Sequence, residues 1–165
     1  MTGKTVVIGI GNALLSDEGL GVRAVDAIKP FYTTDKSIEF IDGGTLSFTL
    51  INFFDNSDNL IIIDATNLRA DPGTIQIFIA DDVTQFLNTY KPNAVHDVNL
   101  FDVLTTARLM NRYPKNIALI AVQPKTMSWG TCLTEAVQSA LPQVNRHVSD
   151  LFDQWDVSHE AVYSY

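Results

Sequence analysis

Three acidic residues follow short apolar segments of the sequence, at positions where their carboxylates could work together. Glu18 comes shortly after the first apolar segment, and Asp42 and Asp64 directly follow the second and the third. If these segments are parallel strands, the carboxylates lie at the edge where open α/β sheets place their ligand crevice. Carboxylates there could transfer protons as general acids or bases, or bind a divalent cation.

His96 adds an imidazole to this set, just before a helix expected over residues 97–111. One Glu, one Asp and one His brought together from separate loops would make a mixed nitrogen and oxygen site, suited to zinc or nickel. The simpler interpretation is that Glu18 complements a helix N-terminus and that Asp42 or Asp64 accepts hydrogen bonds from turn amides. Spacing alone leaves both interpretations open.

Other residues with reactive or aromatic side chains carry weaker signals. Cys132 precedes a helix, but a nucleophilic cysteine needs a histidine within reach, so a small buried residue is the simpler expectation. His147 has polar neighbours, which predicts a solvated or half-packed ring, and His159 lies in a polar tail. Trp129 is either an exposed contact residue or a loop anchor.

A glycine pair after the first apolar segment raises the alternative of dinucleotide binding. Gly9 and Gly11 lie between an expected strand and an expected helix, but Leu14 stands where a Rossmann fingerprint has glycine or alanine. Asp17 and Glu18 would also place two negative charges where a pyrophosphate should bind. The sequence therefore argues against a nucleotide-binding domain.

These residues need elements to position them, and the hydrophobic pattern predicts an α/β fold. Apolar, β-branched segments alternate with helix-period segments along the whole chain, as in βαβ units. We expect strands over residues 4–10, 37–41, 59–63, 74–80 and 116–122. Helical segments are expected after Ser16 and over 45–54, 97–111 and 133–155, and residues 81–93 are expected to form a short helix and a loop.

Local signals refine this pattern. Residues 65–73 are too few for a helical crossover, so the strand over 74–80 should run antiparallel to the others. Ser16 is expected to cap the first helix and Asp97 the helix that follows His96, because both residue types favour N-caps. Pro142 should break the last helical region, because proline cannot donate the backbone hydrogen bond of a helix interior.

Length and charge restrict the classes of protein. The chain has 165 residues, which predicts one domain over 1–165, with residues 156–165 as a flexible tail. Its net charge of −8 repels both a phosphate backbone and an anionic leaflet, so we expect neither a nucleic-acid nor a membrane partner. No apolar run approaches the roughly 18 residues of a membrane span. A single cysteine and no recognisable targeting segment predict a cytoplasmic protein.

Several motifs together resemble a known family. Residues 9–23, GIGNALLSDEGLGVR, closely resemble the opening motif of the [NiFe]-hydrogenase maturation endopeptidases. Further motifs follow in the family's order: DGGT at 42–45, IIDA at 62–65, PGT at 72–74, His96 with DVL at 102–104, and VQP at 122–124. The resemblance covers nearly the whole chain, up to about Trp155.

This resemblance implies a fold, an activity and a site. The fold would be a three-layer α/β/α sandwich around a five-stranded mixed sheet. The activity would be removal of a C-terminal extension from the precursor of a hydrogenase large subunit, after nickel insertion. Glu18, Asp64 and His96 would contact the nickel carried by the precursor, with no organic cofactor, and Asp42 would join Asp64 and Glu18 as a catalytic candidate. The loop 125–131 departs from the family's acidic pattern, so no substrate role is transferred to it.

Two questions about the activity stay open at this point. The attacking water could be activated by a metal or by a carboxylate. The sequence has no HExxH motif, so a conventional protease with resident zinc is not supported. The alternative from another class is an assembly chaperone that recognises the nickel-loaded precursor without cutting it.

Overall fold

A five-stranded mixed sheet forms the centre of the computed structural model, which describes residues 3–32, 36–89 and 98–160. The strand order is β2-β1-β3-β5-β4, with β2 and β4 at the edges. The strands are β1 (Thr5–Ile10), β2 (Ile38–Gly44), β3 (Asn59–Ala65), β4 (Ile75–Ile79) and β5 (Asn116–Val122). Their β-branched, apolar composition suits strands covered on both faces.

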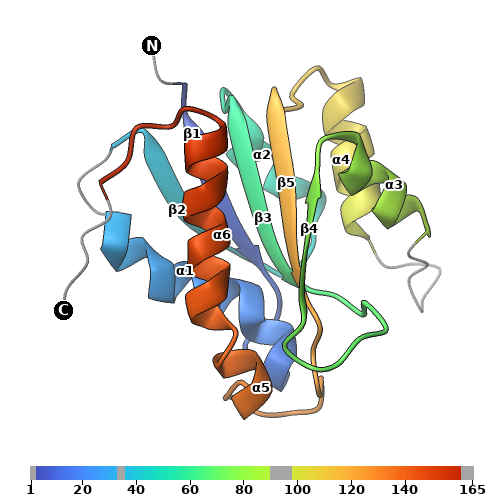
Figure 1. Ribbon diagram of the computed structural model, residues 1–165. Helices are drawn as coiled ribbons and strands as arrows, with labels where there is room; N and C mark the ends of the chain where they lie inside the picture. The colour runs from blue at the N-terminus through green and yellow to red at the C-terminus, as the bar shows by residue number, and fades with distance from the viewer. Residues whose placement is uncertain (1–2, 33–35, 90–97, 161–165) are drawn as a thin grey trace.

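Helices cover both faces of this sheet, so the expected three-layer α/β/α architecture is confirmed (Figure 1). One face carries α1 (Leu20–Ile28), α5 (Glu135–Gln138) and α6 (Leu141–Gln154). The other carries α2 (Ile51–Phe54), α3 (Asp81–Thr89) and α4 (Leu100–Leu109). Three short 3-10 helices flank these elements: Ser16–Gly19 precedes α1, Lys29–Tyr32 follows it, and Phe48–Leu50 precedes α2.

The side chains of β3 alternate between two hydrophobic cores. Ile61 and Ile63 pack into the core under α1 and α6, whereas Leu60 and Ile62 pack into the core under α2, α3 and α4. All four are fully buried. Because successive side chains of a strand point to opposite faces, Asp64 falls on the same face as Leu60 and Ile62. The strand's register therefore assigns Asp64 to the face that α4 covers.

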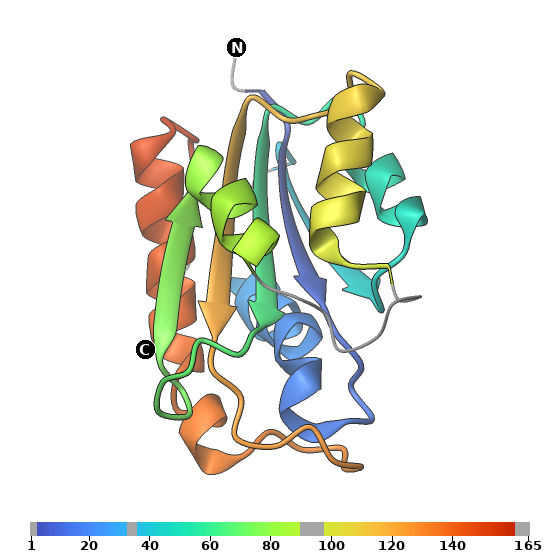
Figure 2. The same cartoon turned by 90° about the vertical axis from the view of Figure 1, so that its right-hand side faces the viewer.

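The antiparallel orientation predicted for the fourth strand is confirmed. β4 pairs with β5 in antiparallel register, from Ile75 opposite Val122 to Ile79 opposite Ala118. The pairs β1–β2, β1–β3 and β3–β5 are all parallel. Figure 2 shows the consequence: the arrowheads of β1, β3 and β5 point to one end of the sheet, and that of β4 points to the other.

The order of the strands creates a crevice at the carboxyl ends of β1 and β3. The chain leaves β1 through α1 toward β2 on one side, and leaves β3 toward β4 and β5 on the other. Connections that diverge in this way leave a gap between their loops, which is where α/β sheets bind ligands. The segments that follow β1, β3 and β5 therefore surround one site.

Two of the predicted helix caps are wrong. Ser16 begins the 3-10 helix Ser16–Gly19, and its hydroxyl donates a hydrogen bond of 2.9 Å to the carbonyl of Ser128 instead of capping α1. The N-cap of α4 is Asn99, which forms a capping box with Asp102; the predicted cap, Asp97, lies outside the described residues. The first error arises because Ser16 binds a distant loop, and the second because Asn99, a nearby residue of a type that also favours N-caps, forms the cap of α4.

The predicted break at Pro142 is confirmed. The last helical region divides into α5 and α6, and Pro142 is in the first turn of α6, where its missing N–H costs nothing. Within the described part of the chain, no helix is both long enough and apolar enough to cross a membrane.

Candidate functional site

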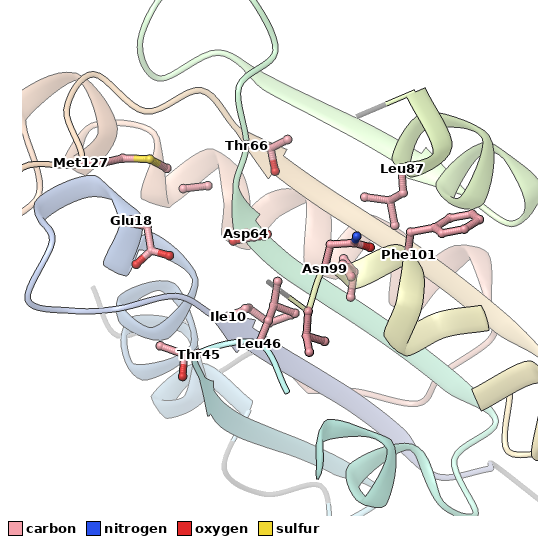
Figure 3. Close-up of a pocket in the computed structure, with 13 residues that line it drawn as sticks. Ile10, Glu18, Thr45, Leu46, Asp64, Thr66, Leu87, Asn99, Phe101 and Met127 are labelled. Atoms are coloured by element: carbon pink, nitrogen blue, oxygen red, sulfur yellow. The ribbon is translucent and has the colours of Figure 1, made fainter. Parts of the chain in front are cut away.

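A pocket of about 450 Å³ opens at the carboxyl ends of β1 and β3, on the face covered by α4. Its walls are largely apolar and include Ile10, Leu46, Leu100 and Phe101. The polar lining includes both Glu18 and Asp64, so two of the predicted site residues meet here. Figure 3 shows their carboxylates facing the same space from two different elements.

Glu18 is positioned by the tight turn that follows β1. It belongs to the 3-10 helix Ser16–Gly19, and its Oε2 accepts a hydrogen bond from the backbone N–H of Asn12. Burial raises the pKa of the Glu18 carboxyl above its ordinary value, and the Asn12 N–H opposes this shift. Among the described residues, Oε1 makes no hydrogen bond, which leaves one oxygen for a ligand.

Asp64 is the penultimate residue of β3 and borders the same pocket. Burial, followed by the negative charge of Glu18, raises the pKa of Asp64 to about 8, although the backbone N–H of Ala65 partly opposes the shift. A carboxyl group with this pKa retains its proton at neutral pH. Strongly shifted carboxyls inside a pocket are typical of catalytic sites and metal sites.

Asp42 is placed differently from these two residues. It lies near the end of β2, is exposed, and does not line the pocket within the described residues. Its Oδ1 accepts a hydrogen bond of 2.8 Å from the backbone N–H of Gly44. This contact matches the turn-amide interpretation, while the following residues Thr45 and Leu46 do line the pocket.

His96, the third predicted metal ligand, lies outside the described residues. Val98 and Asn99, the first described residues after it, line the pocket. Over residues 3–32, 36–89 and 98–160, no group of three His, Cys, Asp or Glu side chains is arranged to hold a metal ion. Glu18 and Asp64 thus supply two oxygen donors to the pocket.

Asp17 connects the turn after β1 to the loop after β5, a role that the sequence did not suggest. Its carboxylate is fully buried and accepts hydrogen bonds from the backbone N–H groups of Lys125, Thr126 and Thr134, at 2.9, 3.2 and 2.7 Å. The Thr134 hydroxyl adds a fourth bond of 2.8 Å. Burial acts to raise the pKa of Asp17, but these hydrogen bonds outweigh it and lower the pKa below its ordinary value.

Gln123 orders the segment that leaves β3 in a similar way. Its Oε1 accepts hydrogen bonds from the backbone N–H groups of Leu68, at 2.6 Å, and Ala70, at 3.4 Å. Its Nε2 donates to the carbonyl of Pro124 at 3.1 Å. The VQP motif gave no indication of the contacts with Leu68 and Ala70, because these residues lie more than 50 positions away in sequence.

None of the weaker candidates lines the pocket. Cys132 is exposed, so its expected burial is wrong, and neither His147 nor His159 lines the pocket. The ring of His159 instead packs against Phe152, with ring centroids 5.2 Å apart. Trp129 is 81% exposed, which favours a contact residue over a loop anchor.

Close contacts at glycine explain the GxG sequence without a nucleotide. A Cβ atom on Gly9 would lie 1.9 Å from the carbonyl oxygen of Gly21, so glycine is required for α1 to pack against β1. Gly11 has φ +144°, and a Cβ there would meet the carbonyl of Glu18. The Glu18 carboxylate also binds the Asn12 N–H, a backbone donor that a phosphate would otherwise require.

Comparison with known proteins identifies the family. A family model described as hydrogenase maturation protease matches residues 22–150. The chain belongs to the hydrogenase maturation protease family. The resemblance inferred from the motifs is thereby confirmed, and the matched residues run from α1 to α6.

Individual relatives of this maturation protease agree with the assignment. The hydrogenase expression/formation protein HupD of Rhizobium leguminosarum bv. viciae is 34% identical over 159 residues, which cover 96% of this chain and 78% of HupD. The hydrogenase 2 maturation protease of Escherichia coli is 35% identical over 140 residues, covering 84% of each chain. The solved structure of the hydrogenase maturating endopeptidase HybD from E. coli superposes with a TM-score of 0.86 at 32% identity, covering 96% of this chain and 98% of HybD.

Proposed function

We propose that this maturation protease removes a C-terminal extension from the precursor of a [NiFe]-hydrogenase large subunit after nickel has been inserted. The observation that carries the proposal is the meeting of Glu18 and Asp64 in one pocket. In this proposal Glu18, Asp64 and His96 approach nickel that the precursor already holds, so that a loaded precursor is the substrate. The proposal places the reaction in the cytoplasm.

The chemistry of the two carboxyls suits hydrolysis of a peptide bond. Cleavage needs a group that removes a proton from the attacking water and a group that donates one to the departing amine. On the carboxylate route Asp64, with a pKa of about 8, holds a proton at neutral pH that it can donate. On the metal route Asp64 gives up this proton and contacts nickel as a carboxylate. Oε1 of Glu18 is available either to accept the proton from water or to contact the metal ion. The two roles of Glu18 correspond to the carboxylate route and the metal route.

In the proposal, Asp42 acts on the substrate from outside the pocket. Its carboxylate is exposed and fixes the turn at Gly44, directly before the pocket residues Thr45 and Leu46. We infer that Asp42 helps to place the precursor for cleavage. Asp42→Asn should therefore weaken cleavage less than a change at Asp64.

The experiment is a cleavage assay on the large-subunit precursor from the same organism, purified with and without nickel. The wild type should shorten only the loaded precursor, and Glu18→Gln, Asp64→Asn and His96→Ala should each reduce the rate by at least about a hundredfold. Glu39→Gln is the matched control, because Glu39 is a half-exposed carboxylate on β2 that pairs with Lys4. A wild type that binds the loaded precursor but never shortens it would show a chaperone instead.

A further inference from the structure

Three large apolar side chains are exposed on two loops beside the pocket. Leu14, in the segment between β1 and α1, is 54% exposed. Met127 and Trp129, in the segment after β5, are 43% and 81% exposed. We name these three residues the apolar rim. Large apolar side chains that gather on a surface mark interaction sites more often than isolated ones do.

Hydrogen bonds between the two loops hold the apolar rim in place. The N–H of Gly130 donates to the carbonyl of Leu14 at 3.0 Å, and the N–H of Ser16 donates to the carbonyl of Gly130 at 2.8 Å. The hydroxyl of Ser16 adds a bond of 2.9 Å to the carbonyl of Ser128. The four hydrogen bonds of Asp17 fix both ends of the second loop. A surface ordered before binding loses less conformational entropy when a partner docks.

The apolar rim is continuous with the pocket that holds the two carboxyls. Met127 belongs to both, because it lines the pocket together with Glu18 and Asp64 while part of its side chain stays exposed (Figure 3). The pocket walls beyond it are apolar as well, at Leu46 and Phe101. A polypeptide in the pocket that continued past Met127 would therefore meet Leu14 and Trp129.

Charge and area indicate the kind of partner. Residues 125–131 include one lysine and no acidic residue, in a chain with a net charge of −8. The loop is therefore better suited to bind an apolar segment than a charged one. Three such side chains can bury about a few hundred Å² of apolar surface. Stable interfaces between folded proteins bury roughly 800 Å² on each partner. The apolar rim therefore suits an extended segment better than a second copy of this chain.

We propose that Leu14, Met127 and Trp129 dock an extended apolar segment of the precursor, adjoining the peptide bond that is cut. This inference rests on the proposed function, because it takes the precursor as the substrate of the same pocket. The apolar rim would hold the chain beside Glu18 and Asp64 and take no part in bond breaking. Its loss should therefore weaken binding and leave the chemical step unchanged.

A kinetic comparison tests this division. Trp129→Ser and Met127→Ser should each raise KM for the loaded precursor about tenfold and leave kcat within about twofold. Leu109→Ser is the matched control, since Leu109 is also 81% exposed but lies at the end of α4, outside the pocket lining. If the wild type cleaves and the variants at Trp129 and Met127 match Leu109→Ser, the docking inference fails while the proposed function stands.

A direct measurement of docking distinguishes the docking inference from the proposed protease function. The chain has two tryptophans, so Trp155→Phe leaves Trp129 as a single site for 5-fluorotryptophan. On addition of unlabelled loaded precursor to the Glu18→Gln variant, the fluorine resonance of Trp129 should shift and lose its sensitivity to exchange of H2O for D2O. An unchanged resonance in a complex detected by sedimentation would overturn the inference.

Self-association that disappears in Trp129→Ser would also overturn the docking inference, because the apolar rim would then bind a second copy of this chain. A shift without any cleavage by the wild type would support docking and reject the protease function.

Discussion

The carboxyl groups of Glu18 and Asp64 are coupled electrostatically across one pocket, although they reach it from different elements. Burial and then the charge of Glu18 raise the pKa of Asp64 to about 8. Glu18 is less affected, because the Asn12 N–H stabilises its charged form. When two carboxyls with different surroundings share a site, one can hold a proton while the other is charged.

Removal of the charge on Glu18 should lower the pKa of Asp64. Glu18→Gln keeps the size of the side chain but removes one of the two causes of the shift, so the pKa should fall below 8 and stay above the ordinary value because burial remains. The measurement is a pH titration of the carbon-13 shift of the Asp64 carboxyl. Glu39→Gln, on the half-exposed salt bridge with Lys4, should leave the titration unchanged. An unaltered Asp64 titration in Glu18→Gln would mean that the two groups are not coupled.

Asp64 should make the protein less stable as the pH rises toward 8. In the unfolded chain an Asp carboxyl loses its proton near pH 3.9, whereas native Asp64 keeps it up to about pH 8. Between these values the unfolded state binds fewer protons, so the free energy of unfolding falls as the pH increases. Asp64→Asn should flatten this slope and raise stability at pH 8 by up to about 5 kcal/mol, because the folded and unfolded pKa values differ by about four pH units and each unit corresponds to about 1.4 kcal/mol. Urea unfolding from pH 4 to pH 9 measures it, with the exposed Asp150→Asn as a control that should follow the wild type.

Asp17 should contribute to stability in the opposite pH direction. Its pKa is lowered in the folded state, so its contribution is complete above the unfolded value near 3.9 and is lost as the pH falls through the folded pKa. Asp17→Asn cannot satisfy all four donors and should cost about 2–4 kcal/mol at pH 7, less in acid. The exposed Asp26→Asn on α1 should change stability by less than about 0.5 kcal/mol. Equal losses at pH 3 and pH 7 would contradict this account.

Gly21 should tolerate no side chain. A Cβ atom there would lie 2.3 Å from the carbonyl oxygen of Ile63 and 2.4 Å from that of Ile10, so α1 would have to move away from the sheet. Gly21→Ala should therefore destabilise the protein by about 1–3 kcal/mol or more. It should also reduce cleavage, because α1 follows the helical turn that carries Glu18. Thermal unfolding tests this, and the exposed Ala27→Ser on the same helix should have a melting temperature close to that of the wild type.

Most of the framework could be predicted because its signals are local. Continuous β-branched segments indicated the five strands, the short connection 65–73 indicated the antiparallel strand β4, and Pro142 marked the break before α6. Each of these depends on a few neighbouring residues and on the geometry of the backbone. The sequence placed Glu18 and Asp64 after parallel strands and so offered their meeting as one of two interpretations, but only the pocket shows that they meet.

The remaining details depend on contacts between distant segments. The sequence predicts that Ser16 caps a helix, yet Ser16 adopts φ 52° and forms hydrogen bonds with residues 128 and 130 instead. The sequence places Asp17 where its negative charge would stabilise a helix N-terminus, yet all the hydrogen-bond partners of its side chain lie in the loop after β5. Local sequence carries no record of a partner more than 100 residues away, so neither role could be predicted.

The bonds between Asp17 and Thr134 also restrict when the site can form during synthesis. Their sequence separation is 117 residues, so the Asp17 carboxylate lacks these partners until most of the chain has left the ribosome. Closing so long a loop costs more chain entropy than local contacts do, and such contacts slow folding. The turn that holds Glu18 is fastened to the loop after β5 by the same bonds. A nascent or truncated chain that ends before Thr134 would therefore lack the ordered turn, and proteolytic competence would arise only with about the last fifth of the polypeptide.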